Sequence, residues 1–124
     1  MLLVGVDIVE IERVRRVALR VPRFQRRLFT PSEQEECAGR ADPFPSLAAR
    51  FAAKEAFLKL HPELAAGVGF REIEVLRGPL GKPLLRASGR ALENLRALRV
   101  AEIDVSLSHS RSHAVAVVVA RGER

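Results

Sequence analysis

The segment of residues 50–59 holds a carboxylate and an ammonium group one helical turn apart. Residues four apart share a helix face, so Phe51, Glu55 and Lys59 would line up on one side. A carboxylate is a ligand for a hard divalent metal ion and an ammonium group pairs with phosphate, so this spacing suits a metal ligand beside a phosphate clamp. The same spacing fits an exposed pair that stabilises a helix by about 0.2–0.5 kcal/mol. Lys54 falls on another face, where we expect it to be solvated.

Two other positions offer groups for the same chemistry. Asp7 follows the apolar run of residues 1–6, which predicts a buried strand that delivers a carboxylate at its C-terminal end. His109 stands among serines between two predicted strands. Each also has an ordinary explanation, because an aspartate often forms a turn after a strand and a loop histidine is often solvated.

Three helices are expected in the first half of the chain. Helical spacing of apolar residues predicts an amphipathic helix over residues 11–21, with arginines on its opposite face. The Thr-Pro-Ser-Glu sequence at 30–33 is a capping-box signature that begins a short acidic helix through Cys37. Prolines within residues 43–46 then open the helix that carries the Glu/Lys pair.

The second half of the chain alternates strand and turn signals. Residues 73–75 form a half-buried strand, and a Gly/Pro-rich turn leads into a second strand over residues 84–87. Ser88 is expected to cap a helix whose buried stripe is Leu92, Leu95 and Leu98. Two antiparallel strands joined through residues 108–112 close the chain.

The order of these elements predicts an α+β fold. Strands interleave with helices and end in a hairpin, which indicates a mostly antiparallel sheet packed by helices. A length of 124 residues fits one small domain over residues 1–124. The longest apolar run, residues 114–120, is too short to span a bilayer. The N-terminus lacks the basic region of a signal peptide and Cys37 is the single cysteine, so we expect a cytoplasmic protein without a disulfide framework.

Net charge points to an anionic partner. Lysine and arginine outnumber aspartate and glutamate by 21 to 15, which gives a net charge of +6. Arginine is densest over residues 13–27, which makes that segment the expected docking surface. Nucleic acid, a phosphorylated small molecule and an acidic protein all fit this charge, although the absence of Trp and Tyr disfavours base stacking.

Three motifs are more specific together than apart. They are Gly5-Val6-Asp7-Ile8 with Glu10 and Arg13, residues 50–59, and Ser106-Leu107-Ser108-His109-Ser110. Their order and spacing over the whole chain resemble the 4'-phosphopantetheinyl transferases of the short holo-[acyl-carrier-protein] synthase type. The Phe-Thr-Pro-Ser-Glu sequence at 29–33 and the Gly-Lys-Pro turn at 81–83 match as well.

The resemblance implies an enzyme of fatty acid biosynthesis. It would transfer the 4'-phosphopantetheine arm of coenzyme A to a serine of an apo acyl carrier protein and release adenosine 3',5'-bisphosphate. The resemblance also implies Mg²⁺ held by Asp7 and Glu55, with Lys59 as the third catalytic residue. Coenzyme A would contact Lys59, Gly81, Lys82, Pro83, Ser108, His109 and Ser110. The carrier would bind Arg13, Arg20, Arg23 and Phe24, and the active sites would lie between the subunits of a homotrimer.

The chain departs from the family pattern in three places. A His-Pro sequence at 61–62 lengthens the loop before the glycines at 67 and 69, Leu80 replaces a common polar residue, and His113 replaces a common tyrosine. These differences concern the adenine side of coenzyme A. Two alternatives without catalysis remain: a basic module that binds nucleic acid, and a scaffold that binds acidic proteins.

Overall fold

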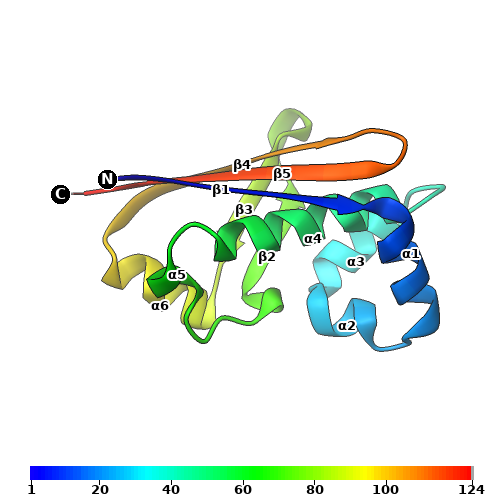
Figure 1. Cartoon of the computed structure of the whole chain (residues 1–124), viewed down its shortest axis with the longest axis horizontal. Coiled ribbons are helices and arrows are strands. Elements are labelled where there is room, and N and C mark those ends of the chain that lie inside the picture. Colours follow the sequence, from blue (N-terminus) through cyan, green and yellow to red (C-terminus); the bar gives the residue numbers. More distant parts are fainter. Residues whose placement is uncertain (124) are drawn as a thin grey trace.

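A three-stranded antiparallel sheet with one long helix along one face forms the centre of the computed structural model, which describes residues 1–123 (Figure 1). The strands are β1 (Leu2–Glu10), β4 (Val100–His109) and β5 (His113–Gly122), in the order β1-β5-β4. The long helix α4 (Phe44–Leu58) packs against β1 and β5 on one face of this sheet. The predicted α+β class, with its antiparallel sheet and closing hairpin, is confirmed.

Small residues let α4 lie close to the sheet. Its buried side includes Ala48, Ala52, Ala53 and Ala56. On β1, a side chain at Gly5 would place a Cβ atom 2.0 Å from the carbonyl oxygen of Ala56, so only glycine permits this approach. The contact sets β1 against the second half of α4, where the Glu/Lys pair lies.

Strand β1 differs from the prediction in length and burial. It continues to Glu10, so Asp7 lies within the strand and not at its end. Because α4 covers only one face of the sheet, alternate residues of β1 are bare on the other face. The exposed fractions there are 71% for Leu2, 57% for Val4, 53% for Val6 and 62% for Ile8. The prediction of a buried strand is therefore wrong for the face of β1 that points away from α4.

Three short helices precede α4. They are α1 (Ile11–Arg20), α2 (Phe24–Leu28) and α3 (Pro31–Ala38). The predicted capping box is confirmed at the start of α3, where the Glu33 backbone N–H donates to Thr30 Oγ1 over 3.2 Å. In return the Thr30 backbone N–H donates to Glu33 Oε1 over 2.9 Å.

The second half forms a hairpin and a helix beside the main sheet. Strands β2 (Ile73–Arg77) and β3 (Pro83–Ala87) pair antiparallel around the 3₁₀ turn η2 (Pro79–Gly81). Before them come helix α5 (Pro62–Ala65) and the 3₁₀ turn η1 (Phe70–Glu72), and after them helix α6 (Gly89–Ala97). None of the helices in residues 1–123 has the length and hydropathy of a membrane span.

The start of α6 is capped differently from the prediction. The Ser88 side chain makes no capping hydrogen bond. Instead Glu72 Oε2 accepts from the Arg90 backbone N–H over 2.7 Å, because the chain returns α6 to the end of η1. Leu95 is buried as expected, with Ala91 beside it on the buried face, whereas the predicted stripe residues Leu92 and Leu98 are half-buried.

Lys54 is buried, so the expectation of a solvated side chain is wrong. Its exposed fraction is 0%, and its Nζ donates to Glu33 Oε1 over 2.8 Å and to the Phe70 carbonyl oxygen over 3.0 Å. A further hydrogen bond goes to the carbonyl oxygen of Ile73. Burial lowers the pKa of Lys54, and Glu33 opposes that shift. The face opposite the sheet thus packs against α3 and β2 through a buried ion pair.

Candidate functional site

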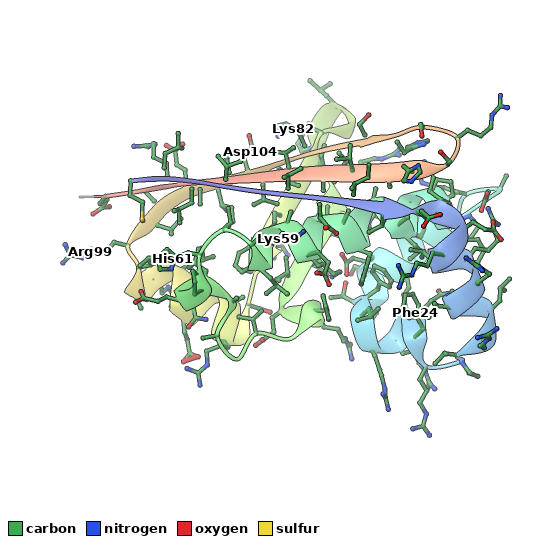
Figure 2. The ribbon with its side chains drawn as sticks, viewed as in Figure 1. Phe24, Lys59, His61, Lys82, Arg99 and Asp104 are labelled. Atoms are coloured by element: carbon green, nitrogen blue, oxygen red, sulfur yellow. The ribbon has the colours of Figure 1, made fainter. Side chains whose placement is uncertain are left out.

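Asp7, Glu55 and Lys59 come together where β1 passes the C-terminal end of α4. Lys59 Nζ donates to Asp7 Oδ1 over 2.7 Å. The Asp7 side chain is only 16% exposed, whereas that of Lys59 is 54% exposed and marks the end of α4 (Figure 2). Asp7 is therefore largely enclosed by the fold, whereas the Lys59 side chain is exposed to solvent on one side of the ion pair.

The electrostatics of the three groups show two carboxylates competing for one cation. Partial burial and then the nearby Asp7 carboxylate raise the pKa of Glu55, while Lys59 acts in the opposite direction. The hydrogen bond from Lys59 to Asp7 raises the pKa of Lys59. Like-charged carboxylates this close favour a shared proton or a bound cation. Among residues 1–123, Lys59 is the only cation within ion-pair distance of either carboxylate.

A cavity of about 530 Å³ opens beside these carboxylates. Asp7 and Glu55 lie in its wall, and its apolar surface comes from Val9, Val14, Val17, Phe24 and Phe51. Arg13 lines the same cavity, together with Glu10 and His113. The predicted docking residues Arg13 and Phe24 therefore open onto the same space as the carboxylates. Arg20 lines a smaller neighbouring groove with Arg13, and Arg23 is exposed just before α2.

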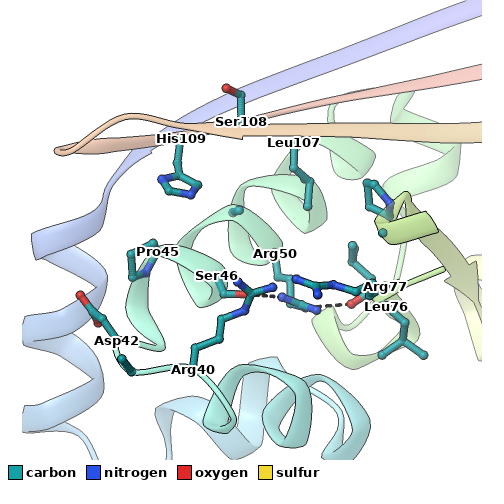
Figure 3. A pocket seen from close by; sticks show the side chains of 15 residues that line it. Arg40, Asp42, Pro45, Ser46, Arg50, Leu76, Arg77, Leu107, Ser108 and His109 are labelled. Carbon is teal, nitrogen blue, oxygen red and sulfur yellow. Dashed lines mark hydrogen bonds between the residues drawn. The ribbon is translucent and has the colours of Figure 1, made fainter. Parts of the chain in front are cut away.

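A second cavity, of about 460 Å³, lies on another side of α4 (Figure 3). Gly81 and Pro83 of the β2–β3 turn line it together with Ser108 and His109 at the end of β4. Four of the predicted coenzyme contacts are therefore neighbours, although Gly81 and Pro83 lie far from Ser108 and His109 in the sequence.

Lys82 and Ser110 lie outside this second cavity. Lys82 Nζ pairs with Asp104 Oδ1 over 2.7 Å, and the two side chains lie together in Figure 2. Ser110 Oγ accepts backbone N–H groups from Ser112 over 3.3 Å and from His113 over 3.1 Å. Within one chain, Ser110 therefore holds the β4–β5 turn and Lys82 holds the hairpin against β4.

Three arginines in the second cavity belong to no predicted site. Arg50 is buried, and its Nε donates to the Val75 carbonyl oxygen over 2.9 Å. Arg50 also pairs with Glu36. Arg40 and Arg77 line the same cavity, and Figure 3 labels all three arginines. No sequence signal indicates Arg40 or Arg77, since Arg40 lies in the loop after α3, Arg77 is the last residue of β2, and neither lies within a motif.

The two cavities share no lining residue within the described part of the chain. The carboxylates open onto the first cavity and His109 points into the second, whereas the Ser108 side chain points to the opposite, bare face of the sheet (Figure 3). One chain therefore divides the predicted site residues into two groups.

Comparison with known proteins gives matches over nearly the whole length. The family model of the 4'-phosphopantetheinyl transferase superfamily matches residues 3–118. A holo-[acyl-carrier-protein] synthase of Syntrophus aciditrophicus is 45% identical over 120 residues, which covers 95% of this chain and 94% of that protein. The corresponding synthase of Geobacter sulfurreducens is 46% identical over 122 residues, with 93% of each chain covered.

Solved structures give the same result. The ACPS–CoA complex of Chronobacterium ammoniagenes superposes with a TM-score of 0.87 at 31% identity, covering 100% of this chain and 99% of that one. A holo-[acyl-carrier-protein] synthase of Helicobacter pylori in complex with coenzyme A gives a TM-score of 0.79 at 31% identity, with coverage of 95% and 99%. Both similar structures contain the coenzyme.

Proposed function

The chain belongs to the holo-[acyl-carrier-protein] synthase family of 4'-phosphopantetheinyl transferases, and we propose that it works with Mg²⁺ and releases adenosine 3',5'-bisphosphate. In this reaction the serine oxygen of the carrier attacks the phosphorus that bears the pantetheine arm. The bond from that phosphorus to the bridging oxygen of the pyrophosphate breaks, and the electron pair leaves with adenosine 3',5'-bisphosphate. The observation that carries the proposal is the meeting of Asp7, Glu55 and Lys59 at one point.

The donor set at this point fits Mg²⁺. Asp7 and Glu55 supply two carboxylates close enough to perturb each other, and Mg²⁺ is usually held by one or two carboxylates plus phosphate and water. Residues 1–123 contain no group of three or more His, Cys, Asp or Glu side chains suited to a metal ion, so a fully protein-bound site is not expected there. When bound, the ion would neutralise charge on the phosphoryl oxygens during transfer.

The side chains of the chain itself supply the remaining chemistry. Glu55, whose pKa is raised, is suited to accept the proton of the carrier serine at a carboxylate oxygen. Lys59 keeps its positive charge, and its exposed side chain would place Nζ at a phosphate oxygen. Asp7 holds the ammonium group beside the position where the phosphate would lie.

We place the adenosine end of coenzyme A in the second cavity. Arg40 and Arg77 provide positive charge there, and Leu76, Pro83 and Leu107 provide apolar surface for a purine ring. His109 points into the same space and offers a ring N–H for a phosphate oxygen, whereas the Ser108 hydroxyl points away from it (Figure 3). The Lys82 side chain contributes through its ion pair, which fixes the turn that carries Gly81 and Pro83.

An acidic acyl carrier protein would dock over α1 and α2. Arg13, Arg20 and Arg23 are exposed there, and Arg13 and Phe24 line the cavity that reaches the carboxylates. Positive surface beside an apolar cavity suits a partner with acidic residues around one inserted arm. The modified serine would then meet Asp7 and Glu55.

Assembly into a homotrimer would complete the site. The bare face of β1, formed by Leu2, Val4, Val6 and Ile8, is an apolar patch of the kind that marks protein interfaces. One chain also keeps its carboxylate cavity and its His109 cavity apart. A neighbouring chain packed on this sheet would bring the second cavity of one copy to the carboxylates of another, so the active sites would lie between subunits.

The proposal is tested by intact mass spectrometry of an apo acyl carrier protein incubated with this protein, coenzyme A and Mg²⁺. We expect the carrier to gain one phosphopantetheine mass, and a chelator to abolish the gain. Adenosine 3',5'-bisphosphate, followed by liquid chromatography, should accumulate in equal amount. Transfer at full rate with the chelator present would refute the metal requirement, and a different nucleotide product would refute the assigned bond cleavage.

A further inference from the structure

We propose that Lys59 acts as a built-in counter-ion that occupies Asp7 in the free protein, weakens metal binding there, and moves to the phosphate when coenzyme A arrives. The inference rests on the proposed function, because it assumes that Asp7 and Glu55 hold the metal ion. It adds an order to the assembly of the site: the metal ion binds tightly only once the coenzyme has drawn Lys59 away.

The first support is the ion pair itself. The ammonium nitrogen lies 2.7 Å from Asp7 Oδ1, at a carboxylate oxygen that a metal ion would need. A cation already at this oxygen repels a divalent ion and reduces the net negative charge of the carboxylate pair. The free protein therefore presents a site of one net negative charge to the metal ion, although it contains two carboxylates.

The second support is the unequal freedom of the two partners. Asp7 is fixed within β1, where it pairs with Ala116 of β5, and its side chain is 16% exposed. Lys59 stands at the end of α4 with its side chain 54% exposed, so its four-carbon stem can turn without disturbing packing. Only the lysine of this pair is free to leave.

The third support is the unsatisfied second carboxylate. Glu55 forms no ion pair within residues 1–123, although it lines the same cavity as Asp7. One ammonium group does not neutralise both carboxylates, whereas a divalent ion does. A phosphate that competes for Lys59 would leave both carboxylates to the metal ion. By thermodynamic linkage, the metal ion must then strengthen coenzyme binding by the same factor.

The test measures metal binding directly, with Mn²⁺ as the probe and the signal of free Mn²⁺ in electron paramagnetic resonance as the readout. Without coenzyme, Lys59→Met should bind Mn²⁺ at least about tenfold more tightly than wild type, because the competing charge is gone. Lys59→Arg keeps the charge and should resemble wild type. Coenzyme A should strengthen Mn²⁺ binding in wild type by a larger factor than in Lys59→Met, after correction for Mn²⁺ bound by coenzyme alone.

A control is available in Arg121→Met. Arg121 is an exposed cation that pairs with Glu102, and it lines neither cavity. This variant should leave Mn²⁺ affinity in the absence of coenzyme unchanged. Asp7→Asn should weaken Mn²⁺ binding in both the wild-type and the Lys59→Met backgrounds.

Two results would overturn the inference: Mn²⁺ affinity of Lys59→Met no higher than that of wild type without coenzyme, or an equal effect of coenzyme in both proteins. These outcomes are independent of transfer. Wild type that modifies the carrier while Lys59→Met gains no metal affinity would refute only the role of Lys59. Wild type that modifies no carrier would count against the proposed function, whatever the Mn²⁺ titrations give.

Discussion

At the residue scale, the Glu55 carboxylate carries an energetic cost in the folded protein. Burial and the Asp7 charge raise the pKa of Glu55, so folding favours the protonated form of this side chain. A group whose pKa rises on folding contributes less stability as pH increases through its titration range. At neutral pH the charged Glu55 therefore opposes folding, and its presence points to a requirement of function.

We predict that Glu55→Gln lowers the rate of carrier modification by at least about 100-fold, as expected for loss of a positioned base and metal ligand. The same substitution should leave the thermal midpoint of the metal-free protein at neutral pH unchanged or higher, because it removes a charge that folding disfavours. The rate is measured by mass spectrometry of the carrier, and the midpoint by circular dichroism.

Glu63→Gln, at an exposed position of α5, serves as the control for both measurements and should alter neither. If Glu55→Gln retained a near wild-type rate, Glu55 would have no part in catalysis. If Glu55→Gln unfolded at a clearly lower temperature than wild type, the conclusion that the charged Glu55 opposes folding would be incorrect.

At the element scale, α4 positions the site through two opposite faces. One face brings Glu55 and Lys59 to β1, and the other anchors the helix to α3 and β2 through Lys54 and Glu33. Glu33 also accepts the Val75 backbone N–H over 2.9 Å, so a single carboxylate joins the helix to the hairpin. The second cavity lies between this hairpin and the end of β4, and its shape depends on that anchor.

We predict that Lys54→Met lowers the free energy of unfolding by about 3–5 kcal/mol, because it leaves the Glu33 carboxylate buried without its cationic partner. The double variant Glu33→Gln with Lys54→Met should recover part of that loss. Urea denaturation followed by circular dichroism measures both. A double variant as unstable as the sum of the two single variants would show that the pair is not coupled.

The contact of Glu72 between η1 and α6 leads to a second prediction at the element scale, about how the stability of the fold depends on pH. Backbone N–H groups of Gly69 and Arg90 lower the pKa of Glu72, so this carboxylate stabilises the fold above its ordinary pKa of 4.5 and loses that contribution as pH falls through the lowered value. Glu72→Gln should be about 1 kcal/mol less stable than wild type at pH 7. The difference should shrink in urea titrations carried out progressively below pH 4.5. A difference that stayed constant with pH would contradict this account.

At the scale of the whole molecule, the exposed face of β1 and the separation of the two cavities point to the same conclusion. An isolated chain leaves a row of apolar side chains bare and divides the residues that we propose contact a single substrate. Contact between copies through the sheet would bury the apolar face of β1 and would also bring the two cavities together. Burial of the apolar side chains would stabilise this assembly.

We predict that Val6→Glu prevents assembly, because it places a charge in the centre of the bare face. Wild type should sediment as three times the mass of 13.7 kDa, and the variant as a folded single chain that transfers no arm. Leu19→Lys, at an exposed apolar residue of α1, is the control for sedimentation and should assemble like wild type. A monomeric wild type with full activity would refute the shared active site.

Much of this architecture is local enough to be predicted from the sequence. Capping residues and apolar periodicity act within one or two turns, which is why α1, the capping box of α3 and the two hairpins match their predictions. The spacing that puts Glu55 and Lys59 on one face of α4 is equally local. The order of the three motifs along the chain likewise indicates the family without any tertiary information.

The environment of each side chain was decided by tertiary structure. Lys54 and Lys59 stand on one helix, yet the first is buried against Glu33 and the second is half-exposed beside Asp7. Helical spacing separates their faces but does not state which strand or helix covers each one. Arg40 and Arg77 likewise meet only because α3 and β2 end at the same cavity. Burial and pairing depend on contacts between distant segments, and those exist only in the folded chain.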